Sequence, residues 1–463
     1  MMRNEPVIWG LICLAAFTPL AFGTTQPWSI ALMELAVLLL TLVYVVPQVA
    51  AGTLIVANPR LLALLSLFTL YVFLQAAPLP AALGRLEFLG LPREALSVYP
   101  RATQEAALKV LAYLALFFLA VQCFPGRPAA GASSAHPPGV YRFAHFLIFF
   151  AFGLSVFALI QHFTFNGKLY WVRELTLGGT PFGPFVNRNH YAGYMELTTP
   201  LPLALALAGG VPGDRRPLYL FMSVVMAASL VLSLSRGGIL SFLCQMGVMA
   251  ALFRFAQGPG EGTRSKLLGL GLVGIGLLAL IVWLGPEPVW RRLGTLTGGD
   301  PAQLFPGRLD VWRDTLRIVA AFPLAGSGLG TFPLLHMVYK TRPTDAVYYE
   351  AHNDYLQVLT ETGVLGGGLL LLFGLLAAGR ALHRLRFERD RTLVGVRIGA
   401  LTGCAGMAFH SVTDFNLQIP ANAVLFFILA GLATMPNIQC GVRSAECGAR
   451  SAERVNFNSR LRT

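Results

Sequence analysis

Charged residues are scarce in this sequence. Only 12% of the 463 residues are Asp, Glu, Lys or Arg, whereas 55% are hydrophobic. Soluble globular domains contain about 25% charged residues, so too few polar side chains are present here to coat a water-soluble body. This scarcity excludes an ordinary soluble enzyme and indicates a membrane protein.

Cysteine clusters, metal-ligand spacings and nucleotide-binding loops are also missing. The six cysteines are scattered and form neither a disulfide framework nor a zinc pattern. His190, His336, His352 and His410 have no ligand spacing such as H-E-x-x-H, so we expect no metal and no cofactor. The absence of a P-loop disfavours an ATP-driven pump.

Long apolar runs fill most of the chain. Each run is long enough to cross a hydrocarbon core of about 30 Å, and residues 267–284, for example, are apolar on every face rather than alternating as in a barrel strand. We predict an all-α, polytopic integral membrane protein with about twelve transmembrane helices. The predicted spans lie near residues 7–23, 28–47, 60–77, 106–124, 142–163, 190–209, 217–234, 237–255, 266–285, 364–382, 395–411 and 418–436.

The distribution of positive charge predicts the orientation. The net charge of +13 is scattered over short loops and includes a dense group from Arg380 to Arg397. This pattern is typical of cytoplasmic loops in an inner-membrane protein, so we expect both termini in the cytoplasm and no nucleic-acid partner. The first apolar segment has no convincing cleavage site and is predicted to remain as a helix.

We divide the chain according to this topology. Three long segments, 78–105, 164–189 and 286–363, fall outside the cytoplasm, and the last carries basic residues that orientation does not explain. Within it, residues 309–322 and 351–361 are predicted to form short helices. The expected divisions are 1–163 with the first five helices, 164–285 with the next four and the arginine motifs, 286–363 as a long periplasmic loop, 364–436 with the last three helices, and 437–463 as a disordered cytoplasmic tail.

Four polar clusters map to the same, periplasmic side. They are F-V-N-R-N-H at 185–190, S-L-S-R-G-G at 233–238, P-G-R-L-D-V-W at 306–312 and E-A-H-N-D-Y at 350–355. Arg236 stands in a short turn between two apolar helices, where an arginine is costly unless it is paired or faces water. We interpret it as a functional residue; the alternative is a side chain that snorkels from a helix end.

Arginines in the other clusters suit an anionic ligand. Arg188 is flanked by Asn187, Asn189 and His190, and Arg308 begins an amphipathic stretch. Planar, permanently charged guanidinium groups are what a phosphate or diphosphate requires. Simpler alternatives are a solvated loop position for Arg188 and, for Arg308, a surface helix on which Asp310 or Arg313 is its partner. The glycines after Arg236, Gly237 and Gly238, would let the backbone approach a ligand.

His352 carries the strongest chemical hypothesis. It begins a helical run that leads through Gly363 into the next span, so its imidazole is expected at the water interface. There it could accept a hydroxyl proton as a general base; the alternative is a buried, hydrogen-bonded histidine. His410 and Asp414, near the outer end of the penultimate span, could orient a partner, but we favour helix capping for both.

Taken together, these motifs resemble the O-antigen ligase family of bacterial membrane glycosyltransferases. The resemblance runs from about Phe182 to Pro436. It is carried by F-V-N-R-N-H-Y-A-G-Y from Phe185, S-R-G-G from Ser235, the series from Gly307 to Phe332 that ends P-L-A-G-S-G-L-G-T-F, and A-H-N-D-Y-L-Q…E-T-G from Ala351 to Gly363. It implies a metal-independent, inverting enzyme of the C-type membrane glycosyltransferase class that moves a glycan from undecaprenyl diphosphate to an acceptor hydroxyl.

The resemblance also implies roles for particular residues. His352 and Arg236 would be catalytic. The diphosphate and glycan would be bound by Arg188, Arg308, Asn187, Asn189, His190, Asn353, Asp354 and Tyr355. The acceptor would be lipid A core, but repeat-unit polymerisation and transfer to protein hydroxyls share these motifs and stay open. More distant alternatives are a small-anion transporter and a structural scaffold of envelope assembly.

Overall fold

The structure is a computed structural model that describes residues 4–79, 86–124, 138–175, 179–257, 261–284, 287, 294, 307–342 and 347–437. Helices dominate this part of the chain. The regular sheet found there is a small antiparallel hairpin of β1 (Leu86–Phe88) and β2 (Leu91–Arg93), with Leu86 opposite Arg93. Of the predicted loop at 286–363, the residues from 286 to 306 other than 287 and 294, and residues 343–346, lie outside the described residues, as does the predicted tail at 437–463 after residue 437.

The connections between the helices vary in length, and the longest described ones join α3 to α4 and α5 to α6. In chain order they are α1 (Glu5–Leu20), α2 (Pro27–Ala50), α3 (Pro59–Ala76), α4 (Pro100–Cys123), α5 (Pro138–Phe163), α6 (Arg188–Thr198), α7 (Pro200–Ala208), α8 (Arg216–Leu232), α9 (Arg236–Gln257), α10 (Glu261–Leu284), α13 (Arg308–Ala321), α14 (Phe332–Tyr339), α15 (Asp354–Arg386), α16 (Arg391–His410) and α17 (Pro420–Thr434). Short 3₁₀ turns lie at η1 (Phe22–Thr24), η3 (Gly213–Arg215) and η4 (Asn416–Gln418).

Eight helical segments in the described residues are long and apolar enough to cross a membrane. They are α2, α3, α4, α5, α8 with its preceding turn, α9, α15 and α16. Shorter apolar helices are α1, α17 and residues 268–283 of α10. The chain is therefore an all-α multi-pass membrane protein, as predicted. A helix lies at each predicted span, but the number of twelve crossings stays a prediction.

Two of the differences from the predicted boundaries are caused by proline. The expected span at 190–209 is divided into α6 and α7, because Pro200 has no N–H to continue the hydrogen-bond ladder. Helix α4 begins at Pro100 rather than at residue 106, because proline is well suited to the first helical position and the polar residues after it form the first turns. The hairpin within 78–105 was not predicted.

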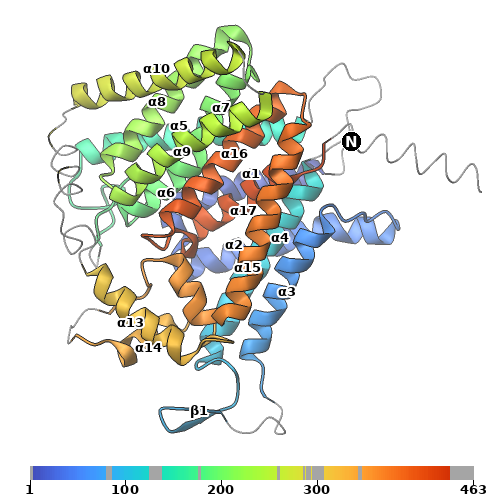
Figure 1. Cartoon of the computed structure of the whole chain (residues 1–463), viewed down its shortest axis with the longest axis vertical. Helices are drawn as coiled ribbons and strands as arrows, with labels where there is room; N and C mark the ends of the chain where they lie inside the picture. The colour runs from blue at the N-terminus through green and yellow to red at the C-terminus, as the bar shows by residue number, and fades with distance from the viewer. Residues whose placement is uncertain are drawn as a thin grey trace, which may run out of the picture.

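One end of the molecule carries the elements outside the bundle. Helices α13 and α14 and the hairpin lie together at the lower end in Figure 1, and α15 runs from there toward the opposite end. Helix α15 is interrupted at Gly363 (φ 60°, ψ −169°), where a Cβ would lie 2.2 Å from the Leu324 carbonyl oxygen. Only glycine tolerates this conformation and this approach. The predicted passage through Gly363 into a span is confirmed.

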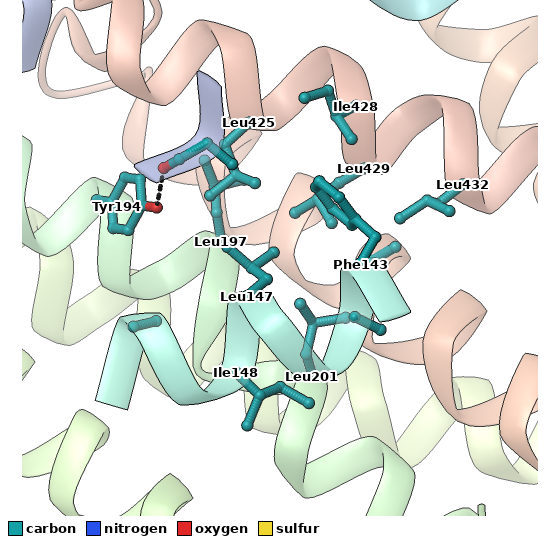
Figure 2. Packing of buried hydrophobic residues seen from close by; sticks show 14 of the residues in the cluster. Phe143, Leu147, Ile148, Tyr194, Leu197, Leu201, Leu425, Ile428, Leu429 and Leu432 are labelled. Carbon is teal, nitrogen blue, oxygen red and sulfur yellow. Dashed lines mark hydrogen bonds between the residues drawn. The ribbon is translucent and has the colours of Figure 1, made fainter. Parts of the chain in front are cut away.

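The core behind this end is apolar and closely packed. Figure 2 shows side chains of α5, α6, α7 and α17 meeting there, with Phe143 and Leu147 facing Leu197 and Leu429. The Tyr194 hydroxyl donates to the Ala15 carbonyl oxygen at 3.1 Å and so ties α6 to α1. This packing fixes α6, whose first residue is Arg188.

Arg397 has a structural role that the charge pattern did not predict. Its side chain is fully buried and donates to the carbonyl oxygens of Ala433 (2.7 Å) and Met435 (3.0 Å) at the end of α17. The last carbonyls of a helix have no partner within the helix, so a guanidinium can satisfy them. Its inclusion among the cytoplasmic loop charges was therefore wrong.

Candidate active site

Asp414, in the turn after α16, gathers three of the four predicted clusters. Its Oδ2 accepts hydrogen bonds from Asn189 Nδ2 (2.6 Å) and Arg308 Nη2 (3.1 Å). Its Oδ1 lies 3.4 Å from His352 Nδ1 and accepts the Phe415 N–H at 3.0 Å. The three side-chain partners, Asn189, Arg308 and His352, come from segments far apart in the sequence, so the fold, rather than local structure, makes this cluster.

The carboxyl of Asp414 is held in its ionised form. Burial by itself raises its pKa, but the hydrogen bond with His352 and the positive charge of Arg308 outweigh burial and hold the pKa well below its usual range. The predicted capping role is wrong for Asp414, because its carboxylate binds side chains of three other segments. Arg308 also donates to the Thr413 carbonyl oxygen, so it faces this turn. The surface pairs of Asp310 are with Arg313 and Arg342 instead.

His352 is positioned by its backbone and by its ring neighbours. Its φ of 52° is in the left-handed region, which non-glycine residues adopt at a cost of about 1–3 kcal/mol and mainly at functional sites. Trp312 Nε1 donates to the carbonyl oxygens of Ala351 (3.1 Å) and His352 (3.3 Å), which fixes this segment. The His352 side chain is 24% exposed, so it is not a fully buried histidine, and its location at the water interface stays a prediction.

The Asp414 carboxylate determines which nitrogen of His352 is available. A carboxylate next to Nδ1 favours the proton on that nitrogen, and the other nitrogen, Nε2, then carries a lone pair. The His352 ring also packs edge-on against Phe415, with ring centroids 4.8 Å apart, and His190 packs against the same ring at 4.8 Å. The imidazole is therefore oriented by the Asp414 carboxylate and by aromatic rings, of which Phe415 is nearer than Tyr348 (centroids 6.3 Å apart).

The fourth cluster reaches the same turn from α9. A Cβ added to Gly237 would lie 2.5 Å from His410 Nε2 and 2.9 Å from Thr413 Oγ1, so the residue after Arg236 is in close contact with the turn. Arg188 and Arg236 are near enough to repel each other: burial and the charge of Arg236 lower the pKa of the Arg188 guanidinium. Within the described residues, Arg188 makes no ion pair.

The glycines beside Arg236 serve helix packing. The atoms nearest to Gly237 belong to His410 and Thr413, and a Cβ on Gly238 would lie 2.7 Å from the Ala192 side chain. Small residues allow membrane helices to approach closely. We expected these glycines to let the backbone approach a ligand. Instead, they let α9 pack closely against α6 and against the end of α16.

The remaining predicted site residues have partners within the chain. Asn187 caps α6 by accepting the Asn189 N–H, and Asn353 caps α15 by accepting the Leu356 N–H. Asp354 accepts from Ser411 Oγ (2.8 Å), and the Tyr355 hydroxyl donates to the Ala408 carbonyl oxygen (2.7 Å). The two caps stabilise the starts of α6 and α15, and the bonds of Asp354 and Tyr355 hold α15 against the end of α16.

A buried polar network next to the site was missed. Glu196 Oε1 lies 2.8 Å from His410 Nδ1, and Glu196 Oε2 accepts from Ser241 Oγ at 3.0 Å. These residues join α6, α16 and α9, the helices nearest to Asn189, Asp414 and Arg236. The predicted capping role of His410 is wrong for this reason. A single glutamate in an apolar stretch was the available signal, because ionisable residues are rare inside membranes.

We looked in the described segments for side chains that could hold a metal ion together. No three His, Cys, Asp or Glu side chains gather there closely enough to hold a metal ion. The cations at this site are guanidinium groups, which bind oxyanions through directed hydrogen bonds.

Comparison with known protein families gives a match over part of the chain. The chain is a multi-pass membrane protein, and a family model matches about a third of its length. More specifically, residues 221–371 match the family model described as O-antigen ligase, which confirms the resemblance over that range. The matched range contains Arg236, Arg308 and His352, whereas Arg188 and Asp414 lie outside it. No protein of curated function matches the chain.

Proposed function

We propose that this protein transfers a glycan from an undecaprenyl-diphosphate carrier to an acceptor hydroxyl, as an O-antigen ligase does. The acceptor is lipid A core or a related molecule, and the reaction takes place at the periplasmic face of the bacterial inner membrane, with both chain termini in the cytoplasm. The observation that carries the proposal is the meeting of Asn189, Arg308 and His352 at Asp414. The family match supports the class of reaction.

The charges of the site suit a diphosphate leaving group. Arg188, Arg236 and Arg308 bring three positive charges to the neighbourhood of one carboxylate, Asp414. Asp414 pairs directly with Arg308, whose Nη2 lies 3.1 Å from Asp414 Oδ2. Preorganised cations in a partly dry cleft stabilise the charge that develops as the bond to the diphosphate breaks. In this proposal the arginines take the place of a metal ion.

His352 and Asp414 act together on the acceptor. Nε2 of His352 accepts the proton of the acceptor hydroxyl while its oxygen attacks the anomeric carbon of the donor sugar. The bond from that carbon to the diphosphate breaks, and its electron pair stays on the phosphate oxygen, so undecaprenyl diphosphate leaves as an anion. The attack is direct, and the anomeric configuration is inverted. Asp414 stabilises the imidazolium that forms, as in other carboxylate–histidine pairs.

Reconstitution of the full-length protein tests the proposal. The purified chain is placed in proteoliposomes with an undecaprenyl-diphosphate glycan, and lipid A core, a second carrier-linked repeat unit and a protein acceptor are offered separately. We expect glycan on lipid A core, unaffected by a chelator, and loss of transfer in Arg236→Ala. Product on the repeat unit or on the protein would instead assign a polymerase or an oligosaccharyltransferase. Flux of a small anion that survives Arg236→Ala, without transfer, would overturn the proposal in favour of a transporter.

A further inference from the structure

A second polar site lies on the α4 side of the His352 segment. It is a pocket of about 230 Å³ between α4, the segment before α15, α15 itself and η4. Its polar lining is mixed in chemistry and includes Glu105, Lys109, Tyr113, Tyr349, Glu350 and Gln418. The mechanism proposed above uses none of these residues.

The pocket adjoins the Asp414 cluster through two short stretches of chain. Glu350 precedes His352 by two residues, a span of at most about 7 Å even in extended backbone. On the other wall, Gln418 follows Asp414 by four residues. Asp354 fastens these stretches together, because its carboxylate accepts from the Leu417 N–H (3.1 Å) and lies 3.4 Å from Gln418 Nε2. These hydrogen bonds therefore fix the position of Gln418, on the wall of the pocket, relative to the segment that carries His352.

The chemistry of the pocket differs from that of the arginine site. Its described lining contains carboxyl, amide, phenol and amine groups but no guanidinium, so it offers no site of the kind that binds a diphosphate. Burial raises the pKa of Glu350 to about 8, so this carboxyl is protonated at neutral pH and can donate as well as accept. Alternating donors and acceptors match sugar hydroxyls, each of which donates one hydrogen bond and accepts others.

We propose that this pocket binds the saccharide of the acceptor, a neutral or amino sugar, and presents one hydroxyl to His352. This inference rests on the proposed function, because it assumes that the donor diphosphate is bound at the arginines on the other side of His352. The two substrates then reach the imidazole from separate sites of different chemistry. Tyr349, which is 64% exposed, lies at the entrance and supplies an aromatic face to the sugar ring.

Three variants of the full-length protein test the proposal. Tyr349→Ala removes an exposed lining residue, and Lys109→Met removes the amine of Lys109 but keeps most of the side-chain volume. Tyr99→Ala is the matched control, because Tyr99 is 51% exposed and does not line the pocket. We expect the two pocket variants to raise KM for the acceptor about ten-fold, because Tyr349→Ala loses the aromatic face and Lys109→Met loses a hydrogen-bond donor, and to leave KM for the donor within about two-fold. An unchanged KM for the acceptor, or a change confined to the donor, overturns the assignment.

A binding measurement separates this inference from the proposed function. Saturation-transfer NMR on the purified protein is carried out with soluble maltotriose, mannotriose, cellotriose and chitotriose as probes. We expect at least one probe to bind, binding to fall by more than half in Tyr349→Ala, and binding to persist in Tyr99→Ala and in Arg236→Ala. Such binding without transfer by the wild-type protein would remove the proposed function but keep a saccharide site. Absence of binding by every probe, or binding unaffected by Tyr349→Ala, overturns the pocket assignment even if transfer is observed.

Discussion

The carboxylate of Asp414 receives side chains from α6, from the start of α13 and from the segment before α15. A histidine that acts as a base needs one nitrogen free and one held, and His352 Nδ1 lies 3.4 Å from this carboxylate. The hydrogen bond is long, as such bonds often are before substrate binds. Asp414 therefore controls both the orientation of the imidazole and the charge of the site.

Replacing Asp414 with asparagine tests this control. The Asp414→Asn side chain has the same shape but no negative charge, so it neither favours the proton on Nδ1 nor stabilises the imidazolium. We expect the rate of glycan transfer to fall by about 10²- to 10⁴-fold, measured as initial rate in proteoliposomes. The control is Asp310→Asn, whose carboxylate pairs with Arg313 and Arg342 and does not contact the turn. Equal rates for the two variants would remove Asp414 from the mechanism.

Glu350 gives the protein a stability that depends on pH. Burial raises its pKa to about 8, so the folded state binds a proton that the unfolded state has released once the pH exceeds about 4.5. Stability is therefore expected to fall as the pH rises from about 5 to about 8. We expect the melting temperature of the detergent-purified wild type to decrease more over this range than that of Glu350→Gln, whose amide can keep the hydrogen bond from Gln357. Parallel curves would contradict a protonated Glu350.

Sequence alone could indicate the residues of the site but not their pairing. Arg236, Arg308 and His352 stood out because charged and ionisable side chains near a membrane require an explanation. The role of Asp414 could not be inferred, because its partners lie 62 to 225 residues away and meet it only through the packing of α6, α13, α15 and α16. Local reasoning offered helix capping, which is the common role of an aspartate near a helix end.

At the scale of the elements, the first turn of α9 packs closely against the turn that carries Asp414. Gly237 brings the first turn of α9 against His410 and Thr413, next to the Asp414 turn. Gly247, in the middle of the same helix, has open space where a Cβ would be. The two glycines therefore form a matched pair, one at a close approach and one without a neighbour.

Alanine substitutions at these two glycines should have different effects. In Gly237→Ala the added methyl group pushes α9 away from the turn, and we expect a loss of about 1–3 kcal/mol of stability and at least ten-fold slower transfer. In Gly247→Ala we expect equal or slightly greater stability, because alanine favours the helix. Thermal melting and initial rates measure both effects. Equal behaviour of the two variants would show that the close approach at Gly237 is unimportant.

The helices themselves were largely predictable, because the length and composition of apolar runs follow the thickness of the bilayer. The exceptions have local causes. Pro200 divides a continuous apolar run into α6 and α7, and Pro100 starts α4 among polar residues that hydropathy assigns to a loop. Hydropathy measures transfer into lipid, whereas these two boundaries are determined by the backbone of proline.

At the scale of the whole molecule, orientation is the prediction with the widest consequences. Tyr349 and Phe387 lie just outside the two ends of α15 and are 64% and 61% exposed. In a background without native cysteines, we expect an impermeant maleimide added to intact cells with a permeable outer membrane to label Tyr349→Cys but not Phe387→Cys. Lysed cells, in which both positions should react, provide the control. The reverse pattern would place the candidate site in the cytoplasm, where the proposed reaction does not occur.

The position of Asp414 late in the chain has a consequence for biosynthesis. Arg188, Arg236, Arg308 and His352 all precede α16 in the chain and leave the ribosome before it. Asp414, whose carboxylate contacts Arg308 and His352, follows α16. During synthesis the chain therefore contains the arginines and His352 before it contains Asp414. The imidazole can be oriented by Asp414 only when α16 and the turn after it are in place. If the proposed function holds, an incompletely inserted chain is therefore expected to transfer no glycan.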